Sequence, residues 1–137
     1  MRTVTKAGLA LGAALATALV ACSSSTSSSK SLDPNGTWTV TAHVTSCYDA
    51  TGTGEVTVVN DSIPMTQIFA YSAYGQNQTV SVVGSMVRGN NSLTVSGNEW
   101  LAGDACNGGN AFYGYIPADS MKGIVYSSWG SLTFQKK

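Results

Sequence analysis

Charged residues and histidine are scarce in this chain of 137 residues. Only 10% of the residues are charged, seven Lys and Arg balance seven Asp and Glu, and there is a single His. Without an excess of positive charge the chain has little with which to neutralise phosphates, so we expect no nucleic-acid partner. One His and three Cys also leave few ligands for a metal ion, and we expect no cofactor.

The sequence also lacks the common catalytic motifs. It contains no G-x-S-x-G segment and no phosphate-binding glycine loop. Its acids fall mostly in expected turns and strand ends, at spacings that force no two of them together: Asp49, Glu55, Asp61, Glu99, Asp104 and Asp119. Because catalysis needs polar groups that converge on one point, we expect the protein not to be an enzyme.

The N-terminus has the organisation of an export signal. Arg2 and Lys6 precede fifteen uncharged residues, Ala7 to Ala21, which are Ala, Leu, Gly and Val with one Thr. A helix needs about 20 apolar residues to span a bilayer, so this run is too short for a membrane anchor. A charged start, a short apolar run and small residues at its end predict a signal peptide over residues 1–21.

The signal ends in Leu19-Val20-Ala21-Cys22, which resembles the lipobox of bacterial lipoproteins. The resemblance implies cleavage before Cys22, a diacylglycerol on its sulfur and an acyl chain such as palmitate on its amino group. Two or three chains on one residue would hold the protein durably, whereas one chain binds only reversibly. With Ser23 after the Cys, the resemblance favours the outer membrane of a bacterial envelope, on its periplasmic or surface face.

A serine-rich segment follows the lipobox. Residues 23–31 are seven Ser, one Thr and Lys30, so they have no apolar surface to bury. Such composition predicts a disordered, flexible linker over residues 22–32, ahead of a single domain over residues 33–137. The mature chain keeps five cations and seven anions, and we expect the lipid rather than a basic surface to hold it on the membrane.

The domain reads as a series of short strands. Residues 37–45 alternate between an apolar and a polar side, and weaker alternation marks 55–60, 63–73, 79–88, 92–97, 112–116, 121–125 and 132–134. About eight strands at this spacing predict an all-β fold, a small antiparallel up-and-down barrel or alternatively a β-sandwich. We expect glycines at inward positions (Gly84, Gly114, Gly123) to permit tight curvature, and the interior to be filled by Trp38, Met65, Phe69, Met86, Met121 and Phe134.

Two cysteines remain in the domain, Cys47 and Cys106. In an oxidising compartment such a pair most often forms a disulfide. The alternative is a reactive thiol, which needs a nearby base. His43 precedes Cys47 by four residues but falls on the polar side of its strand, so the disulfide is the favoured prediction.

The start of the first strand resembles a known family. Gly36-Thr37-Trp38 follows an Asp33-Pro34-Asn35 turn and is similar to the G-x-W signature of lipocalins and of related calycin barrels. The closing segment, from Asp119 to Phe134, is similar in rhythm to the end of short lipocalin-like bacterial domains. The resemblance implies a barrel in which Trp38 closes one end.

Aromatic side chains are the candidates for recognition. Tyr113 and Tyr115 alternate with Phe112, Gly114 and Ile116 and should face outward. Together with Trp100 and Tyr126 they predict an exposed binding surface, since Tyr and Trp carry much of the energy at protein interfaces. The alternative is that these rings cover barrel seams or the disulfide.

These features predict a lipid-anchored envelope protein whose barrel binds an envelope protein or a small apolar ligand. A ligand inside the barrel would need a cavity of a few hundred Å³. Two other functions remain open. One is inhibition of lysozymes or proteases, because the chain resembles bacterial inhibitors of such enzymes in architecture. The other is a purely structural role in the envelope.

Overall fold

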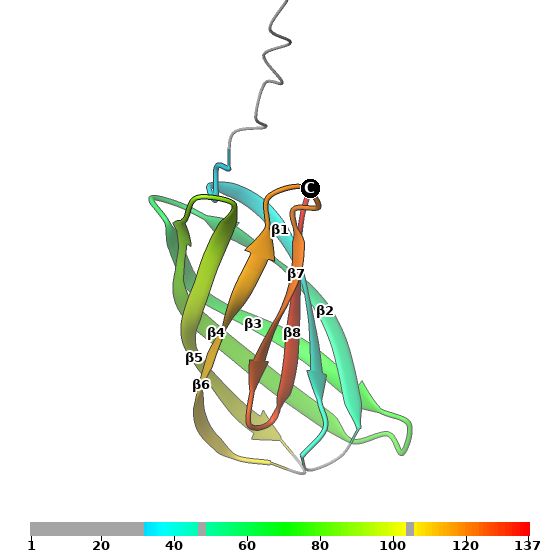
Figure 1. Cartoon of the computed structure of the whole chain (residues 1–137). Coiled ribbons are helices and arrows are strands. Elements are labelled where there is room, and N and C mark those ends of the chain that lie inside the picture. Colours follow the sequence, from blue (N-terminus) through cyan, green and yellow to red (C-terminus); the bar gives the residue numbers. More distant parts are fainter. Residues whose placement is uncertain (1–31, 47–48, 104–105) are drawn as a thin grey trace, which may run out of the picture.

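The strands close into one antiparallel barrel, in which each strand pairs with its neighbours in sequence and β8 returns to β1 (Figure 1). The computed structural model describes residues 32–46, 49–103 and 106–137. The predicted signal peptide, lipobox and Cys22 lie outside these residues, as do residues 23–31 of the predicted linker. The strands are β1 (Gly36–Val44), β2 (Ala50–Val58), β3 (Ser62–Ser72), β4 (Asn77–Arg88), β5 (Ser92–Gly103), β6 (Gly108–Pro117), β7 (Lys122–Ser127) and β8 (Gly130–Lys136).

Strand β1 follows the predicted alternation. Trp38, Val40, Ala42 and Val44 are all buried, while the threonines between them are partly exposed. β1 lies between β2 and β8, so its backbone is paired on both sides and its alternate side chains enter the interior. The predicted closed barrel is therefore confirmed over the sandwich.

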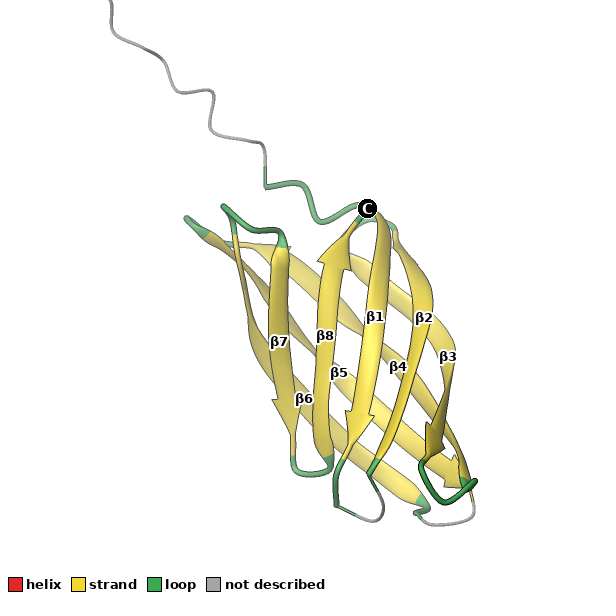
Figure 2. Ribbon diagram, turned by 90° about the vertical axis from the view of Figure 1, so that its right-hand side faces the viewer, coloured by secondary structure: helices red, strands yellow, loops and turns green. Residues whose placement is uncertain are grey.

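The barrel can be divided into two groups of strands that are joined by short ladders. Figure 2 shows β7, β8, β1 and β2 running side by side at the front, with β3 beside β2 at the right edge and β4 to β6 crossing behind them. The ladders where the two groups meet are short: Ala50 and Thr51 pair with Ser72 and Tyr71, and Tyr113 and Gly114 pair with Tyr126 and Val125. These two corners, β2–β3 and β6–β7, are where the sheet folds over to close.

Glycine permits the close approach of strands at both corners. A Cβ on Gly52 would lie 2.0 Å from the carbonyl oxygen of Phe69, and one on Gly114 would lie 2.8 Å from Val125. Any side chain at these positions would push the strands apart, so the corners depend on glycine. Gly114 was among the glycines predicted for tight curvature.

The prediction for β3 was wrong in part. The register of β3 against β4 shifts between Ile63 and Thr66, so the strand contains an irregularity that reverses which residues face inward. Ile63, Ile68 and Ala70 are buried, whereas Met65 and Phe69 are each 59% exposed. Met65 and Phe69 therefore point outward from the barrel. An unbroken alternation of side chains from Ile63 would have pointed both of them inward.

The remaining predicted core residues divide differently. Trp38, Met86 and Phe134 are fully buried, as expected. Met121 is only partly buried, because it lies in the turn before β7 with a φ of 48° rather than in the strand. Leu32, placed in the linker by composition, packs against the core, so it belongs to the folded domain.

Both termini of the described chain lie at one end of the barrel, here called the terminal end (Figure 1). Asp33 Oδ1 accepts hydrogen bonds from the backbone and side-chain nitrogens of Asn35, and these bonds lower the pKa of Asp33. Asn35 in turn accepts a hydrogen bond from the backbone of Asp61. The described Lys and Arg residues lie near this end: Arg88 and Lys136 bond the backbone of Leu32 and Asp33, Lys137 bonds Glu55, and Lys122 is paired with Gln135.

Candidate functional site

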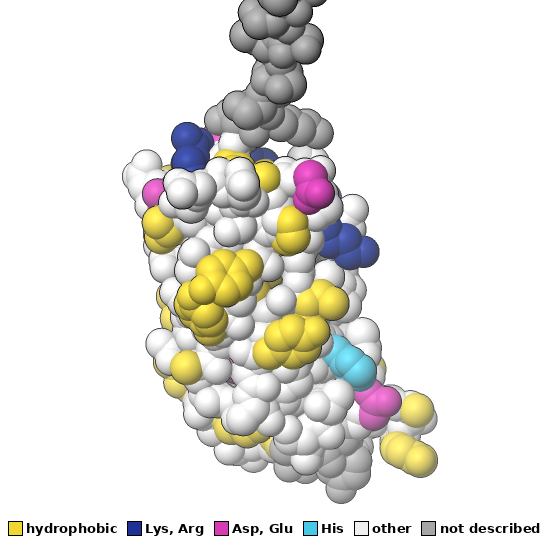
Figure 3. All heavy atoms as spheres, in the orientation of Figure 1, with side chains coloured by type: hydrophobic (Ala, Val, Ile, Leu, Met, Phe, Trp, Pro, Cys, Tyr) yellow, Lys and Arg dark blue, Asp and Glu magenta, His cyan; other side chains and the backbone are white. Residues whose placement is uncertain are grey.

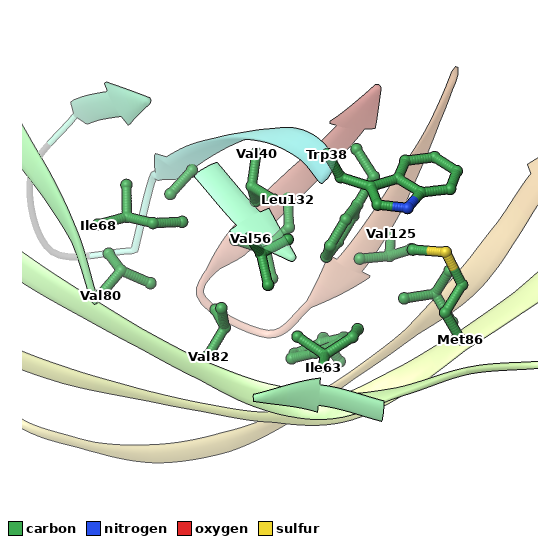
Figure 4. Close-up of a cluster of buried hydrophobic side chains, with 14 of the residues drawn as sticks. Trp38, Val40, Val56, Ile63, Ile68, Val80, Val82, Met86, Val125 and Leu132 are labelled. Atoms are coloured by element: carbon green, nitrogen blue, oxygen red, sulfur yellow. The ribbon is translucent and has the colours of Figure 1, made fainter. Parts of the chain in front are cut away.

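The barrel interior is the first candidate site, and it is filled by side chains. Figure 4 shows buried residues from opposite strands directed toward one another. A Cβ added to Gly97 would lie 2.6 Å from Cζ of Phe112, and one added to Gly123 would lie 2.9 Å from the Ile116 side chain. The largest inward side chains, Trp38, Phe112 and Phe134, are at most 2% exposed, so the interior is occupied by side chains as in an ordinary protein core.

Trp38 occupies the interior next to the terminal end. Its ring is fully buried, and its Nε1 donates a hydrogen bond of 2.7 Å to the carbonyl oxygen of Pro34. The ammonium nitrogen of Lys136 lies 5.6 Å from the ring centroid, within range of a cation–π interaction. These contacts tie the segment before β1 and the end of β8 to one ring, which is a geometry suited to the barrel-closing role predicted for it.

Glu99 is a buried acid inside the wall. It lies on β5 between Val82 of β4 and Asn110 of β6, is 4% exposed, and its Oε1 has no hydrogen-bond partner. Burial raises the pKa of Glu99, and a hydrogen bond from the Ser127 side chain opposes this only in part. Glu99 was among the acids expected mostly in turns and strand ends, whereas it lies within β5 with its carboxyl buried.

The outer face carries a cluster of exposed aromatic side chains, which we call the tyrosine patch: Tyr113, Tyr115, Ile124 and Tyr126. These side chains are between 45% and 65% exposed. Tyr113 of β6 lies directly opposite Tyr126 of β7, and the rings of Tyr113 and Tyr115 meet edge to face at 5.3 Å. Figure 3 shows exposed hydrophobic side chains gathered on this face.

The tyrosine patch covers the β6–β7 corner and is exposed, while its role as a binding surface stays a prediction. The side chains lie over a seam of the barrel, yet more than half of each tyrosine remains open to solvent. The hydroxyl groups of Tyr113 and Tyr115 are hydrogen-bonded to each other, which raises the pKa of Tyr113. The two rings therefore contact each other edge to face and through their hydroxyl groups.

Trp100, the fourth predicted member of the binding surface, lies apart from the patch but on the same outer face. It is 40% exposed and stands opposite Gly109, where an added Cβ would lie 2.8 Å from the indole Nε1. The ring therefore rests over the glycine backbone of β6. Four residues along β6 separate Gly109 from Tyr113, a distance of about 13 Å in a strand.

A second exposed aromatic group lies on β3 and was missed from the sequence. Phe69 and Tyr71 are 59% and 61% exposed and line an open hollow of about 340 Å³ together with Thr79 and Ala102. Counting alternate residues from Ile63, before the irregularity in β3, predicts that Phe69 and Tyr71 point inward, so their outward orientation was missed. The surface lies across β3, β4 and β5, separate from the tyrosine patch.

Two pairs of ionisable side chains, His43 with Asp49 and Lys137 with Glu55, meet on the outer surface of the described residues. His43 and Asp49 share an exposed hydrogen bond, with Nε2 and Oδ1 2.5 Å apart. In the same part of the chain, no three His, Cys, Asp or Glu side chains gather where they could hold a metal ion. Nor does that part contain a helix long and apolar enough to cross a bilayer.

Cys106 is buried at the far end of the barrel. Its backbone is held by the buried amide of Gln78, whose Nε2 donates to the Cys106 carbonyl at 2.8 Å and whose Oε1 accepts from its N–H at 3.3 Å. Its predicted partner, Cys47, lies outside the described residues, so the disulfide stays a prediction.

Comparison of the chain with protein-family models, with curated proteins and with solved structures produced no significant match.

Proposed function

We propose that the protein is a lipoprotein of the bacterial cell envelope, acylated at Cys22, and that its barrel is a non-enzymatic binding module working through its outer face. The lipobox supports the anchor. The observation that carries the binding role is the tyrosine patch. Its aromatic rings are exposed, two of them contact each other, and the barrel beneath them has a filled interior. Aromatic side chains of this kind contribute most of the binding energy at recognition surfaces.

The packing of the interior favours this function over carriage of a small apolar ligand. A carrier needs an enclosed volume of roughly 300 Å³ or more. The space between opposite walls is occupied by residues such as Met86, Phe112 and Phe134, each no more than 2% exposed. A partner is therefore met outside the barrel.

The anchor limits where that partner can be. Leu32 is ten positions after Cys22, and an extended chain covers at most about 3.6 Å per residue. The terminal end would then stay within about 36 Å of the membrane, and the tyrosine patch, on the side wall, would face material next to the bilayer. Components of the envelope are the partners this arrangement serves.

The proposal is tested by photo-crosslinking in the cells that make the protein. A benzophenone amino acid placed at Tyr126 should give crosslinked products that the same group at Tyr71 does not give. Tyr71 is a matched control because it is an exposed strand tyrosine, 61% against 65%, outside the patch. Equal or absent products at both positions would refute binding through the patch.

The anchor has its own test. Cells given an alkyne-labelled palmitate analogue should label the wild-type chain and not the Cys22→Ala variant. Labelling that persists in Cys22→Ala would show that the acyl chain is elsewhere.

A further inference from the structure

The surroundings of the tyrosine patch are made of uncharged hydroxyl side chains. On the β5 side, Ser96 lies opposite Tyr113 and Thr94 opposite Tyr115. On the β8 side, Ser131 lies opposite Tyr126 and Thr133 opposite Ile124. Directly paired residues share a face, so these four partly exposed side chains flank the patch on both sides of the same outer surface.

Charged side chains lie only at the borders of this surface among the described residues. Lys122 is two residues from Ile124, toward the terminal end, and His43 is beyond Ser131 on β1. Neither lies within the patch or its hydroxyl flanks. Figure 3 likewise shows the apolar side chains of this face surrounded by uncharged atoms, with the charged side chains toward the ends and one edge.

The surface continues toward Trp100 as a low strip. Between Tyr113 and Gly109 on β6 the next outward residue is Ala111, which pairs with Asn98 on β5. Both are exposed, one is small and the other is an amide. Two aromatic platforms about 13 Å apart on one face, with a low polar floor between them, suit an extended ligand better than a compact one.

This combination of groups selects a class of ligand. Tyr and Trp offer flat apolar faces with polar edges, and Ser, Thr and Asn both donate and accept hydrogen bonds. An anionic polymer would call for Arg or Lys in the surface. A protein interface is typically depleted in Ser and enriched in Arg. A sugar chain has flat CH faces, hydroxyl edges and no charge, so it matches each part of the surface.

We infer that the tyrosine patch and Trp100 bind an uncharged polysaccharide chain laid along β6. This inference rests on the proposed function and names the chemistry of the partner. Sugar rings stack on the exposed rings of Tyr126 and Tyr115 and on the indole of Trp100, while the hydroxyl flanks bond the ring edges. Adjacent sugars pass over Ala111 and Asn98.

The test uses the full chain, extracted from its own membranes in a mild detergent. The protein is mixed with insoluble chitin, with cellulose and with heparin beads, and the fraction that sediments is measured. We expect sedimentation with at least one of the two neutral polymers and none with anionic heparin. Because the contacts involve no ion pairs, raising the salt concentration should leave the binding unchanged.

Matched variants locate the site. Tyr126→Thr should weaken binding about tenfold, as loss of one aromatic anchor does, and Tyr71→Thr should leave it within about twofold. Threonine keeps the preference for a strand, and circular dichroism checks that both variants fold. Tyr126→Phe, which keeps the ring and its packing, should retain most of the binding.

The possible failures are distinct. Wild-type protein that stays in solution with both chitin and cellulose overturns the inference, as does equal loss of binding in Tyr126→Thr and Tyr71→Thr. If Tyr126 then crosslinks to an envelope protein, the patch is a protein interface and the proposed function stands. If it crosslinks to nothing, the proposed function falls as well.

Discussion

Replacing Trp38 by Phe tests the barrel-closing role most informatively. Phenylalanine keeps an aromatic ring in the interior but cannot donate to the Pro34 carbonyl, which Trp38 bonds at 2.7 Å. Loss of a buried hydrogen bond costs about 1–3 kcal/mol when the acceptor is left unsatisfied. The smaller ring adds the cost of unfilled space, and the cation–π contact with Lys136 weakens.

These terms together predict a loss of about 2–4 kcal/mol in the free energy of unfolding. For a domain of about 100 residues, each kcal/mol lowers the melting temperature by about 4–8 °C. Trp38→Ala would remove the whole ring and cost about 3–5 kcal/mol, enough to unfold a marginally stable domain. Trp38→Phe is therefore the variant whose result can be interpreted.

Urea unfolding followed by far-UV circular dichroism measures the effect, in the chain from residue 22 with Cys22→Ala to keep it free of lipid. Trp100→Phe is the matched control, because Trp100 is 40% exposed and its replacement should change stability by less than about 0.5 kcal/mol. Equal stability of Trp38→Phe and Trp100→Phe would refute the argument that Trp38 secures the terminal end.

Three further predictions concern the interior. Gly97→Ala should destabilise the domain by about 1–3 kcal/mol in the same urea assay, since its Cβ would lie 2.2 Å from the carbonyl oxygen of Val83 and 2.6 Å from Cζ of Phe112, and an unchanged midpoint would contradict this close approach of β4 and β6 to β5. Burial raises the pKa of Glu99, so folding favours its neutral form. The free energy of unfolding therefore has its full value at low pH and falls as the pH rises through the raised pKa of Glu99. Glu99→Gln should therefore be more stable than wild type at about pH 8, with the difference shrinking toward about pH 4, and a constant difference would argue against a buried titrating acid. If Cys47 and Cys106 form a disulfide, iodoacetamide should label neither cysteine before reduction, and reduction should cost about 4 kcal/mol; labelling of the unreduced folded chain would exclude the bond.

The fold followed from the sequence where local pattern and packing agree. In β1 the inward residues are all apolar, and pairing on both sides makes the pleat regular, so alternation alone placed Trp38 to Val44 correctly. In β3 the irregularity after Ile63 depends on how β4 aligns with it, which the residues of β3 do not encode by themselves. The orientation of Phe69 was lost for that reason.

Strand ends rich in glycine were harder to predict. The first half of β2 has Gly52 and Gly54 instead of apolar residues, because β3 passes too close for side chains there. The second half of β5 turns Glu99 inward, against the cost of burying a carboxyl. The first half of β2 and the second half of β5 are strands because of their contacts with neighbouring strands, and these contacts cannot be read from the local sequence pattern.

The candidate surface was partly visible in advance. Parity with the buried Phe112 correctly placed Tyr113 and Tyr115 outward. That Tyr113 would lie opposite Tyr126 depends on the register across a short ladder at a barrel corner. The hydroxyl flanks are placed by the registers of β5 with β6 and of β7 with β8, so the chemistry of the surface emerged only with the fold.

The claim that the barrel is filled and meets its partner outside is tested most directly by native mass spectrometry of the full chain released from its own cells. The account predicts the mass of the acylated polypeptide alone. A small molecule that remains with the folded chain and leaves only on collisional activation would contradict it.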